Sequence, residues 1–420
     1  MKTPQKGAFD GLRLALAILT LTILAVKLVV IPHPWPSLPP EECTYEARVE
    51  CGFIFDEAHY IRAVRMMMKG VWDVNMEHPP LAKLLIMLGI LVLGDNPWGW
   101  RLIPALTGTA SIYLTGLIAY ELTRSKRTSL IAAALFGLDV ACFNLSSIAI
   151  LDPIALMFSL LGALLFLRQR WLLSGLSFGL ALLSKLTTVF ILASILATWL
   201  AASWLRLRDH KKALRSWVGG LERVGFIAFL VFIAGMWPYE LVAKKYATPF
   251  EHLDFMLEYH GKMLQPNPEE GAPPLSWTNP ILQFPRQPLY VIPDMTIAYY
   301  CLQTPLWWMS WLVFAFSIYA AILELRGGGL PLTELATASW FTLTYLIYFP
   351  ISLLRPVYPF YFYMTVPAIA IGFSNMMREG GVCEIIRLLL LAAQIIWLVI
   401  FFPIKPQWLV TILRNAGLLQ

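Results

Sequence analysis

Runs of apolar residues, each about 20 residues long, dominate the chain, and short polar segments separate them. An α-helix rises about 1.5 Å per residue, so a run of this length crosses the hydrocarbon layer of a bilayer. The run at 171–205 is too long for one helix and is expected to turn at Lys185. The pattern therefore predicts about eleven membrane spans. We expect them at roughly 11–31, 98–122, 129–146, 150–167, 171–205 (two spans), 225–242, 305–325, 334–354, 358–377 and 385–403.

The polar segments give the orientation of these helices. The loops expected at 121–129 and 206–217 are rich in lysine and arginine, as cytoplasmic loops of membrane proteins are. Alternation of the helices then places the N-terminus inside, the C-terminus outside, and the segments 33–97 and 244–294 on the outer face. The first apolar run has no small-residue cleavage site, which indicates a retained helix rather than a signal peptide.

The first outer segment contains two helical patterns of its own. Between 56 and 71, apolar residues recur at helical spacing with cations between them, which predicts an amphipathic helix in the membrane interface. The apolar positions are Ile61, Val64, Met67, Met68 and Val71. Pro79 and Pro80 are then expected to begin a second helix over 81–93, because proline is tolerated in a first turn. That helix is too short to span the bilayer comfortably and is expected to be interfacial or half-inserted.

Composition narrows the class of protein. The 420 residues are 58% hydrophobic and 14% charged, which excludes a soluble globular protein. No polar segment is long enough to bury its own core, so the sequence predicts one all-α transmembrane domain over 1–420. The net charge of +6 comes from cations in short loops and does not indicate nucleic-acid binding. No Cys/His cluster with zinc spacing is present, whereas Cys43 and Cys51 could form a disulfide on an oxidising outer face.

The segment 55–83 concentrates charge beside an apolar surface. It contains Asp56, Glu57, His59, Glu77 and His78. Carboxylates in such a place are unfavourable unless they are solvated or paired. Two interpretations remain open at this point: an active-site loop on the membrane, or a solvated loop whose charges keep it out of the lipid.

Further charges are expected to gather on the same outer face. They are Lys83, Arg101, Asp152, Lys185 and Arg355. Cations on this face can bind an anionic lipid headgroup, arginine by contacting a phosphate in a bidentate way and lysine as a point charge. Asp152 has the alternative of pairing with one of these cations, and Arg355 that of extending to the interface from an aromatic segment.

The order of these residues resembles a known family. The Asp-Glu pair at 56–57 and the later EHPPLAK at 77–83 are similar to the first luminal loop of protein O-mannosyltransferases, which has an Asp-Glu pair and a His-Pro-Pro-Leu-x-Lys motif. The similarity continues through Arg101 in GWRLIPALTGT, Asp152, and GLALLSK ending at Lys185. It covers at least 50–190, although the turn before Asp152 reads SIAIL and lacks the arginine of the family pattern.

This resemblance implies a GT-C glycosyltransferase that uses a polyprenyl-phosphate sugar, most simply mannose, as donor and Ser/Thr hydroxyls of proteins as acceptors. It implies that Asp56 is the catalytic base and that Arg101 binds the lipid phosphate. Eukaryotic members carry a β-trefoil domain in a later luminal loop, and 244–294 is too short to hold one. The chain therefore resembles a compact prokaryotic, archaeal-type member.

The chemistry of such a transfer suits the same residues. A hydroxyl nucleophile needs a positioned carboxylate, which is the role expected for Asp56. The departing phosphate needs cations, for which Arg101 with Lys185 or Lys83 are candidates. One base and one displacement predict inversion at the anomeric carbon. Glu57 is expected to position the acceptor or to tune Asp56, and His78 to contact the donor or to form the helix-capping turn.

The mechanism requires no cofactor, although Glu77 with His78 and His59 could bind a divalent metal. Expected partners are the lipid-linked donor, the protein acceptor and the bilayer, with no nucleic acid. One alternative is transfer to a lipid acceptor, as in the related aminoarabinose transferases. A secondary transporter is the weaker alternative, because no internal repeat is evident and the charges are expected at one face rather than at the midplane.

Overall fold

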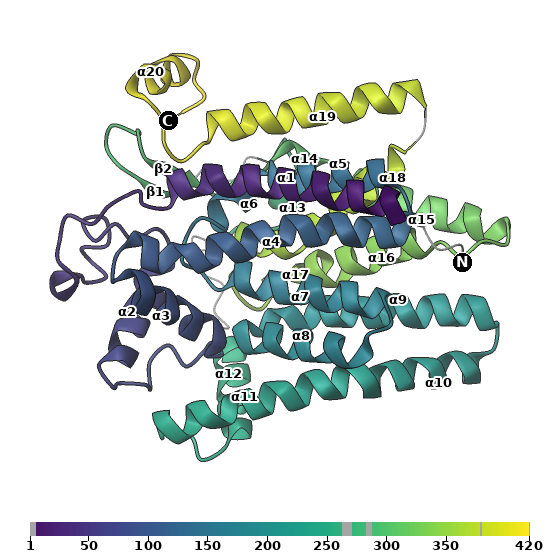
Figure 1. Ribbon diagram of the computed structural model, residues 1–420, viewed down its shortest axis with the longest axis horizontal. Coiled ribbons are helices and arrows are strands. Elements are labelled where there is room, and N and C mark those ends of the chain that lie inside the picture. Colours follow the sequence, from purple (N-terminus) through teal and green to yellow (C-terminus); the bar gives the residue numbers. More distant parts are fainter. Residues whose placement is uncertain (1–5, 263–270, 283–287, 379, 420) are drawn as a thin grey trace.

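The structure is a computed structural model that describes residues 6–262, 271–282, 288–378 and 380–419. Its long helices run side by side, so that the connecting segments collect at two ends of a bundle (Figure 1). One end, at the left of Figure 1, carries helices α2 (Glu57–Met68), α3 (Leu81–Leu93) and α12 (Pro249–Lys262) and the hairpin of β1 (Pro288–Val291) and β2 (Ala298–Tyr300). The N-terminus lies toward the other end. We call the first of these the α2–α3 end.

The helices of the first half of the bundle follow the apolar runs, except that the span predicted at 129–146 is divided into two helices. They are α1 (Lys6–Val30), α4 (Pro97–Thr123), α5 (Lys126–Gly137), α6 (Val140–Leu145), α7 (Asp152–Leu167), α8 (Trp171–Ser184) and α9 (Val189–Leu207). The predicted break at Lys185 is confirmed, because this residue has an extended backbone (φ −161°, ψ 127°) between α8 and a 3₁₀ turn, Leu186–Thr188. Its backbone departs from the helix where its side chain turns to Asp152.

The second half continues the same arrangement. It contains α10 (His210–Gly220), α11 (Ile227–Ala243), α14 (Pro305–Trp308), α15 (Ser310–Arg326), α16 (Leu332–Phe341), α17 (Tyr348–Ser352), α18 (Val366–Met376), α19 (Gly381–Ile400) and α20 (Gln407–Asn415). π-helical turns at Leu221–Phe226 and Thr342–Leu346 join α10 to α11 and extend α16 toward α17. Short 3₁₀ turns lie at Pro40–Glu42 and Pro359–Met364.

One sequence prediction was wrong in this half. The basic segment 206–217 was expected to be a loop, but most of it is helix α10. Asp209 caps that helix, since its side chain accepts hydrogen bonds from the backbone N–H groups of Lys211 and Lys212. Lysine, alanine, leucine and arginine then favour the helix, which continues through the π-turn into α11.

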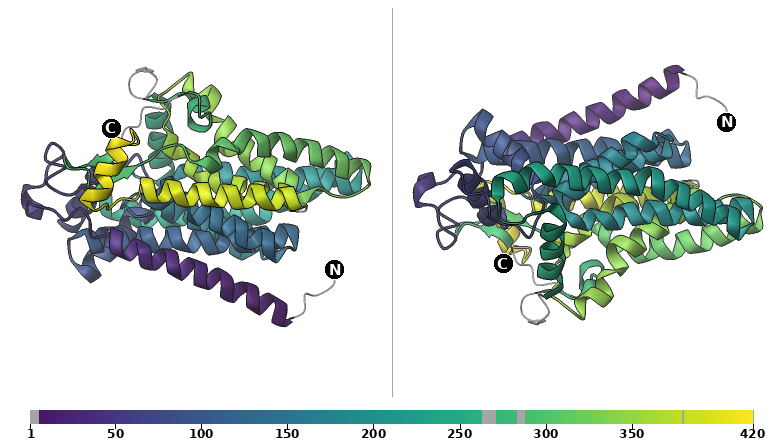
Figure 2. Two further views of the ribbon diagram at one scale, coloured as in Figure 1. Left: turned by 90° about the horizontal axis from the view of Figure 1, so that it is seen from above. Right: turned by 90° about the horizontal axis from the view of Figure 1, so that it is seen from below.

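The described residues contain five helices long and apolar enough to cross a membrane, namely Asp10–Val30, Pro97–Thr123, Leu186–Leu207, His210–Ala243 and Gly381–Ile400. Shorter apolar helices accompany them, so the predicted number of about eleven spans stays a prediction. Only 22% of the apolar window in α1 and 17% of that in α19 is buried, against 67% in α4. Figure 2 shows α1 along one edge of the bundle, and such exposed apolar surface fits an integral membrane protein.

The α2–α3 end is built from short elements. They are α2 (Glu57–Met68), α3 (Leu81–Leu93), α12 (Pro249–Lys262), α13 (Pro274–Thr278), and strands β1 (Pro288–Val291) and β2 (Ala298–Tyr300), which pair antiparallel. The helix predicted over 81–93 is present as predicted, and the helix predicted over 56–71 is present but ends at Met68. Helix α2 buries Ile61, Val64 and Met67, whereas Met68 at its end and Val71 beyond it are exposed.

A close contact between two glycines fixes the position of α3 against α4. Gly89 of α3 packs directly on Gly99 of α4, because a Cβ atom at Gly89 would overlap the Gly99 carbonyl oxygen. Cys43 and Cys51 lie in contact as free thiols, with Cys51 hydrogen-bonded to Cys43, so a disulfide between them stays a prediction. Part of 244–294, expected only as an outer loop, forms α12, α13 and β1.

Candidate active site

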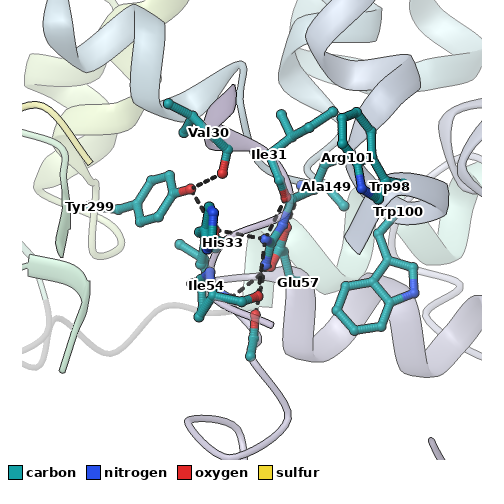
Figure 3. A network of polar contacts seen from close by, with 12 residues as sticks. Val30, Ile31, His33, Ile54, Glu57, Trp98, Trp100, Arg101, Ala149 and Tyr299 are labelled. Atoms are coloured by element: carbon teal, nitrogen blue, oxygen red, sulfur yellow. Dashed lines mark hydrogen bonds and ion pairs between the residues drawn. The ribbon is translucent and has the colours of Figure 1, made fainter. Parts of the chain in front are cut away.

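Glu57 and Arg101 form a buried ion pair at the α2–α3 end, within a network of hydrogen bonds (Figure 3). Both side chains are 0% exposed. Arg101 Nε and Nη2 donate to the two Glu57 oxygens at 2.7 and 2.8 Å. The other donors of Arg101 reach the carbonyl oxygens of Ile31, His33 and Gly52 at 2.7–2.9 Å.

This network uses every hydrogen-bonding position of both side chains. A guanidinium has five N–H donors, and all five of Arg101 have an acceptor. A carboxylate accepts about four hydrogen bonds, and Glu57 receives two from Arg101 and one each from the backbone N–H groups of Ile54 and Ala149. Arg101 therefore has no donor left for a lipid phosphate, and Glu57 has no position left for an acceptor. These contacts favour a structural role for both side chains over the roles expected from the sequence, a phosphate ligand for Arg101 and an acceptor ligand for Glu57.

The network instead joins segments that are far apart in the sequence. It connects the end of α1, the loop before α2, α4, and the turn before α7. Tyr299 of β2 adds a further strand, since its hydroxyl donates to the carbonyl of His33 at 2.6 Å. Asp56 immediately precedes Glu57, so this framework fixes the backbone that carries Asp56.

Asp56 itself has the opposite character to Glu57. No described residue donates a hydrogen bond to its carboxylate, which lies near Lys185 and Asp152. Burial raises the pKa of Asp56 to about 7; Lys185 opposes this shift and Asp152 adds to it. A carboxylate whose pKa lies near neutrality is suited to accept a proton in a reaction.

Lys185 and Asp152 form a second buried ion pair beside Asp56. Lys185 Nζ donates to both Asp152 oxygens at 2.8 Å. The ammonium also lies 5.4 Å from the Phe360 ring centre and 5.8 Å from that of Tyr361. The alternative interpretation of Asp152, as the partner of a cation, is therefore what the structure has.

Arg355 approaches the same place from the segment before the 3₁₀ turn at 359–364. Its contacts are long: Nη1 lies 3.4 Å from His260 Nδ1 and 3.3 Å from the His260 carbonyl, and Nη2 lies 3.4 Å from the Tyr361 hydroxyl. Hydrogen bonds of this length are weak. No described carboxylate forms an ion pair with Arg355, so its charge is available to an anionic ligand.

His78 completes the group. Its ring lies 5.8 Å from that of Tyr60 and 5.4 Å from that of His260. Burial lowers the pKa of His78 well below its usual value, and the nearby cations Lys185 and Lys83 lower it further. The imidazole is therefore neutral and can donate or accept one hydrogen bond at each nitrogen according to its tautomer.

Lys83 is buried beneath this loop rather than inside the group. Its ammonium donates to the carbonyl oxygens of Asn75 and His78, the latter at 2.9 Å. This geometry gives Lys83 a role in holding the loop, not in contacting a phosphate.

Five of the residues singled out in the sequence thus come together: Asp56, His78, Asp152, Lys185 and Arg355. Sequence reasoning missed His260 and Tyr361, which contact Arg355. A signal existed for the histidine, because five of the six histidines of the chain fall within the two segments expected on the outer face.

The metal site considered for Glu77, His78 and His59 has no support in the geometry. Among the described residues, no group of three or more His, Cys, Asp or Glu side chains could hold a metal ion. The His59 ring instead lies 5.1 Å from that of Tyr45, and Glu77 accepts a hydrogen bond from the Asn75 side chain at 2.6 Å.

Comparisons with known proteins agree with the resemblance in the sequence. Residues 51–239 match the family model for dolichyl-phosphate-mannose-protein mannosyltransferase. The polyprenol-phosphate-mannose–protein mannosyltransferase of Mycobacterium tuberculosis is 27% identical over 230 residues, which cover 44% of this chain and 44% of that protein. The corresponding protein of Mycolicibacterium smegmatis is 35% identical over 112 residues, or 25% of this chain and 22% of that one. The matched part spans less than half the length of these relatives.

Solved structures show the fold. The S. cerevisiae Pmt1–Pmt2 protein O-mannosyltransferase complex bound to the sugar donor superposes with a TM-score of 0.71 at 11% identity, over 100% of this chain and 94% of that one. ArnT from Cupriavidus metallidurans gives 0.54 at 16% identity, over 89% and 62%. The oligosaccharyltransferase AglB of Archaeoglobus fulgidus gives 0.54 at 15% identity, over 98% and 56%. The chain therefore has the fold of the GT-C glycosyltransferases.

Proposed function

We propose that this chain, whose residues 51–239 match the protein mannosyltransferase family model, transfers mannose from a polyprenyl-phosphate donor to Ser/Thr hydroxyls of proteins. One observation carries the proposal. The Asp56 carboxylate receives no hydrogen bond from a described residue and lies beside the Lys185–Asp152 pair, in the part of the chain that matches the family.

The reaction assigns one step to Asp56. Its carboxylate takes the proton of the acceptor hydroxyl while the hydroxyl oxygen attacks the anomeric carbon. The bond from that carbon to the phosphate oxygen breaks, and its electron pair leaves with the phosphate. A single displacement of this kind inverts the anomeric carbon and forms no covalent intermediate on the protein.

Arg355 is the cation that we assign to the departing phosphate. Its guanidinium is held only by contacts of 3.3–3.4 Å, so it can exchange them for charge-assisted hydrogen bonds to phosphate oxygens. Lys185 has a different role. Its ammonium is bonded to both oxygens of Asp152, and its charge lowers the pKa of the nearby Asp56, which favours the ionised form of that carboxyl group. The neutral His78 lies near Lys185 and Arg355, and we assign it to contact the donor.

The site lies at the α2–α3 end, which the positive-inside pattern of the sequence assigns to the outer face of the cell membrane. A lipid-linked donor reaches this end from the bilayer, and a protein acceptor reaches it from the aqueous side. Both partners can therefore meet at this end without crossing the membrane.

The test is mannose transfer from a polyprenyl-phosphate-mannose donor to a Ser/Thr peptide by the purified full chain in lipid. Asp56→Asn should reduce kcat by at least about hundredfold, because general-base catalysis contributes roughly 10²–10⁴ in rate. Asp73→Asn is the matched control, since Asp73 is an exposed carboxylate in the same outer segment. It should leave kcat unchanged.

The other outcomes separate the alternatives. Near-normal transfer by a well-folded Asp56→Asn variant would remove Asp56 as the base. Mannose appearing on a lipid but not on the peptide would identify the lipid-acceptor reaction. Loss of transfer on chelation, restored by a divalent ion, would show that a metal takes part in the step.

A further inference from the structure

The loop that carries His78 is held in an unusual way. Four consecutive backbone carbonyls, at residues 75–78, each accept a hydrogen bond from a side chain. Lys83 reaches the first and the fourth, whereas the second and third belong to two histidines of α12, His252 and His260. Loops seldom have so many carbonyls bound by side chains, since side chain–backbone bonds are a minority of protein hydrogen bonds.

His252 binds the carbonyl of Met76 through Nε2 at 2.7 Å, and its Nδ1 contacts Glu240 of α11. A carbonyl only accepts, so Nε2 must carry a hydrogen. The Nδ1 contact with a carboxylate then requires one more proton, held on the imidazole or on Glu240. His252 is 0% exposed, and the rings of Tyr246 and Tyr239 stack at 4.8 and 6.0 Å from it. The side chain is sealed away from any substrate.

His260 binds the next carbonyl, that of Glu77, through Nε2 at 2.9 Å. The same argument places a hydrogen on Nε2. Its Nδ1 faces Arg355 Nη1, which can only donate, so Nδ1 is the acceptor and the imidazole is neutral. His260 thereby links the loop before His78 to the cation assigned to the phosphate.

We propose that His252 and His260 are positioning residues that clamp residues 75–78 onto α12. This proposal rests on the proposed function, because the clamp places His78 and Arg355 around Asp56 for the transfer. The two histidines bind adjacent carbonyls although they lie about two turns apart on one helix. Both bonds therefore form only if α12 keeps its position against the loop. Glu240, His252 and His260 lie beyond the residues that match the family model.

The clamp predicts how the loop responds to loss of either histidine. Amide hydrogen exchange of residues 72–78 is measured on the full chain in lipid, without donor or acceptor. His252→Leu and His260→Leu should each increase the exchange rate of this segment by about tenfold, because each variant loses one hydrogen bond to a loop carbonyl. Exchange in α4 (97–123) serves as the internal reference and should not change.

The clamp also predicts that the two leucine variants affect kcat and the donor KM differently. His260→Leu should raise the donor KM as well as lower kcat, because Arg355 loses its neighbour. His252→Leu should lower kcat alone, because His252 lies away from Arg355. His260→Gln should recover most of the activity, because glutamine offers both a donor for the Glu77 carbonyl and an acceptor for Arg355. Asp254→Asn, an exposed position on the same helix, is the control and should match the wild type.

The results distinguish failure of the clamp from failure of the proposed reaction. Unchanged exchange at 72–78 in both leucine variants would overturn the clamp, whatever the wild type transfers. Faster exchange with unchanged kcat and donor KM would also overturn it, since the loop would then not position the site. Faster exchange in a protein that transfers no mannose would support the clamp and refute the reaction.

Discussion

Two arginines at the same end of the molecule are held in opposite ways. Arg101 is fully buried, and all five of its donors have acceptors at 2.7–2.9 Å. Arg355 is partly buried and has contacts of 3.3–3.4 Å. The two adjacent acids repeat the contrast, because Glu57 is saturated with hydrogen bonds and Asp56 receives none from the described residues. A group whose hydrogen-bonding positions are all occupied is suited to hold a structure, whereas a group with weak or missing hydrogen bonds can readily take a new partner during a reaction.

The largest expected effect is on stability, and it tests Arg101, the arginine whose donors all have acceptors. Arg101→Met leaves the buried Glu57 without its cation, which should lower the free energy of unfolding by about 3–5 kcal/mol. Thermal unfolding of the purified protein in lipid measures this change. Combining it with Glu57→Leu should recover part of the loss, because a buried apolar pair replaces a buried charge without a partner. An unchanged melting temperature with a raised donor KM would mean that Arg101 binds the donor after all, as the resemblance implies.

A smaller effect, on donor binding, tests Arg355, the arginine with long and weak contacts. Arg355→Ala should raise the donor KM by about tenfold, or about 1.4 kcal/mol of binding, while the melting temperature changes little. Donor titration at saturating peptide gives the KM. Arg62→Ala, an arginine of α2 outside the group, is the matched control. If Arg355→Ala unfolds the protein as Arg101→Met should, the two arginines are alike and the contrast between them fails.

The smallest effect concerns pH. Because burial raises the pKa of Asp56 to about 7, kcat/KM should rise about tenfold per pH unit below 7 and level off above it. The same shift acts on stability with the opposite sign. A carboxyl group with a raised folded-state pKa favours the folded state at low pH and loses that advantage as the pH rises from about 4 to 7.

Asp56→Asn removes this titration. The variant should therefore gain stability over the wild type as the pH rises through that window, by a few kcal/mol at most, with thermal unfolding at pH 5 and pH 8 as the measurement. A difference that stays constant between the two pH values would show that Asp56 ionises normally in the folded protein.

The sequence predicts local features of this molecule better than the partners of its charges. The prolines at 79–80 and the lysine at 185 mark where helices begin and break, and the structure has both features. The gathering of Asp56, Asp152, Lys185 and Arg355 was also predicted, because alternation of the helices places these residues at one end.

The partners of Arg101 could not be predicted in the same way. Three of its acceptors are backbone carbonyls, at Ile31, His33 and Gly52, and a sequence does not indicate which carbonyls a fold leaves free. The role of α12 was hidden for a related reason. Its segment was expected only as a polar loop, although its histidines bind a loop about 180 residues earlier in the chain.

The contact of Gly89 with Gly99 has a consequence for the height of the site in the bilayer. The two helices meet backbone to backbone, so α3 cannot slide along α4 as a helix cushioned by flexible side chains can. Lys83, near the start of α3, holds the loop at 75–78. The level of this loop is therefore set by the protein rather than by the lipid, and we expect the geometry of the proposed site to be the same in membranes of different thickness.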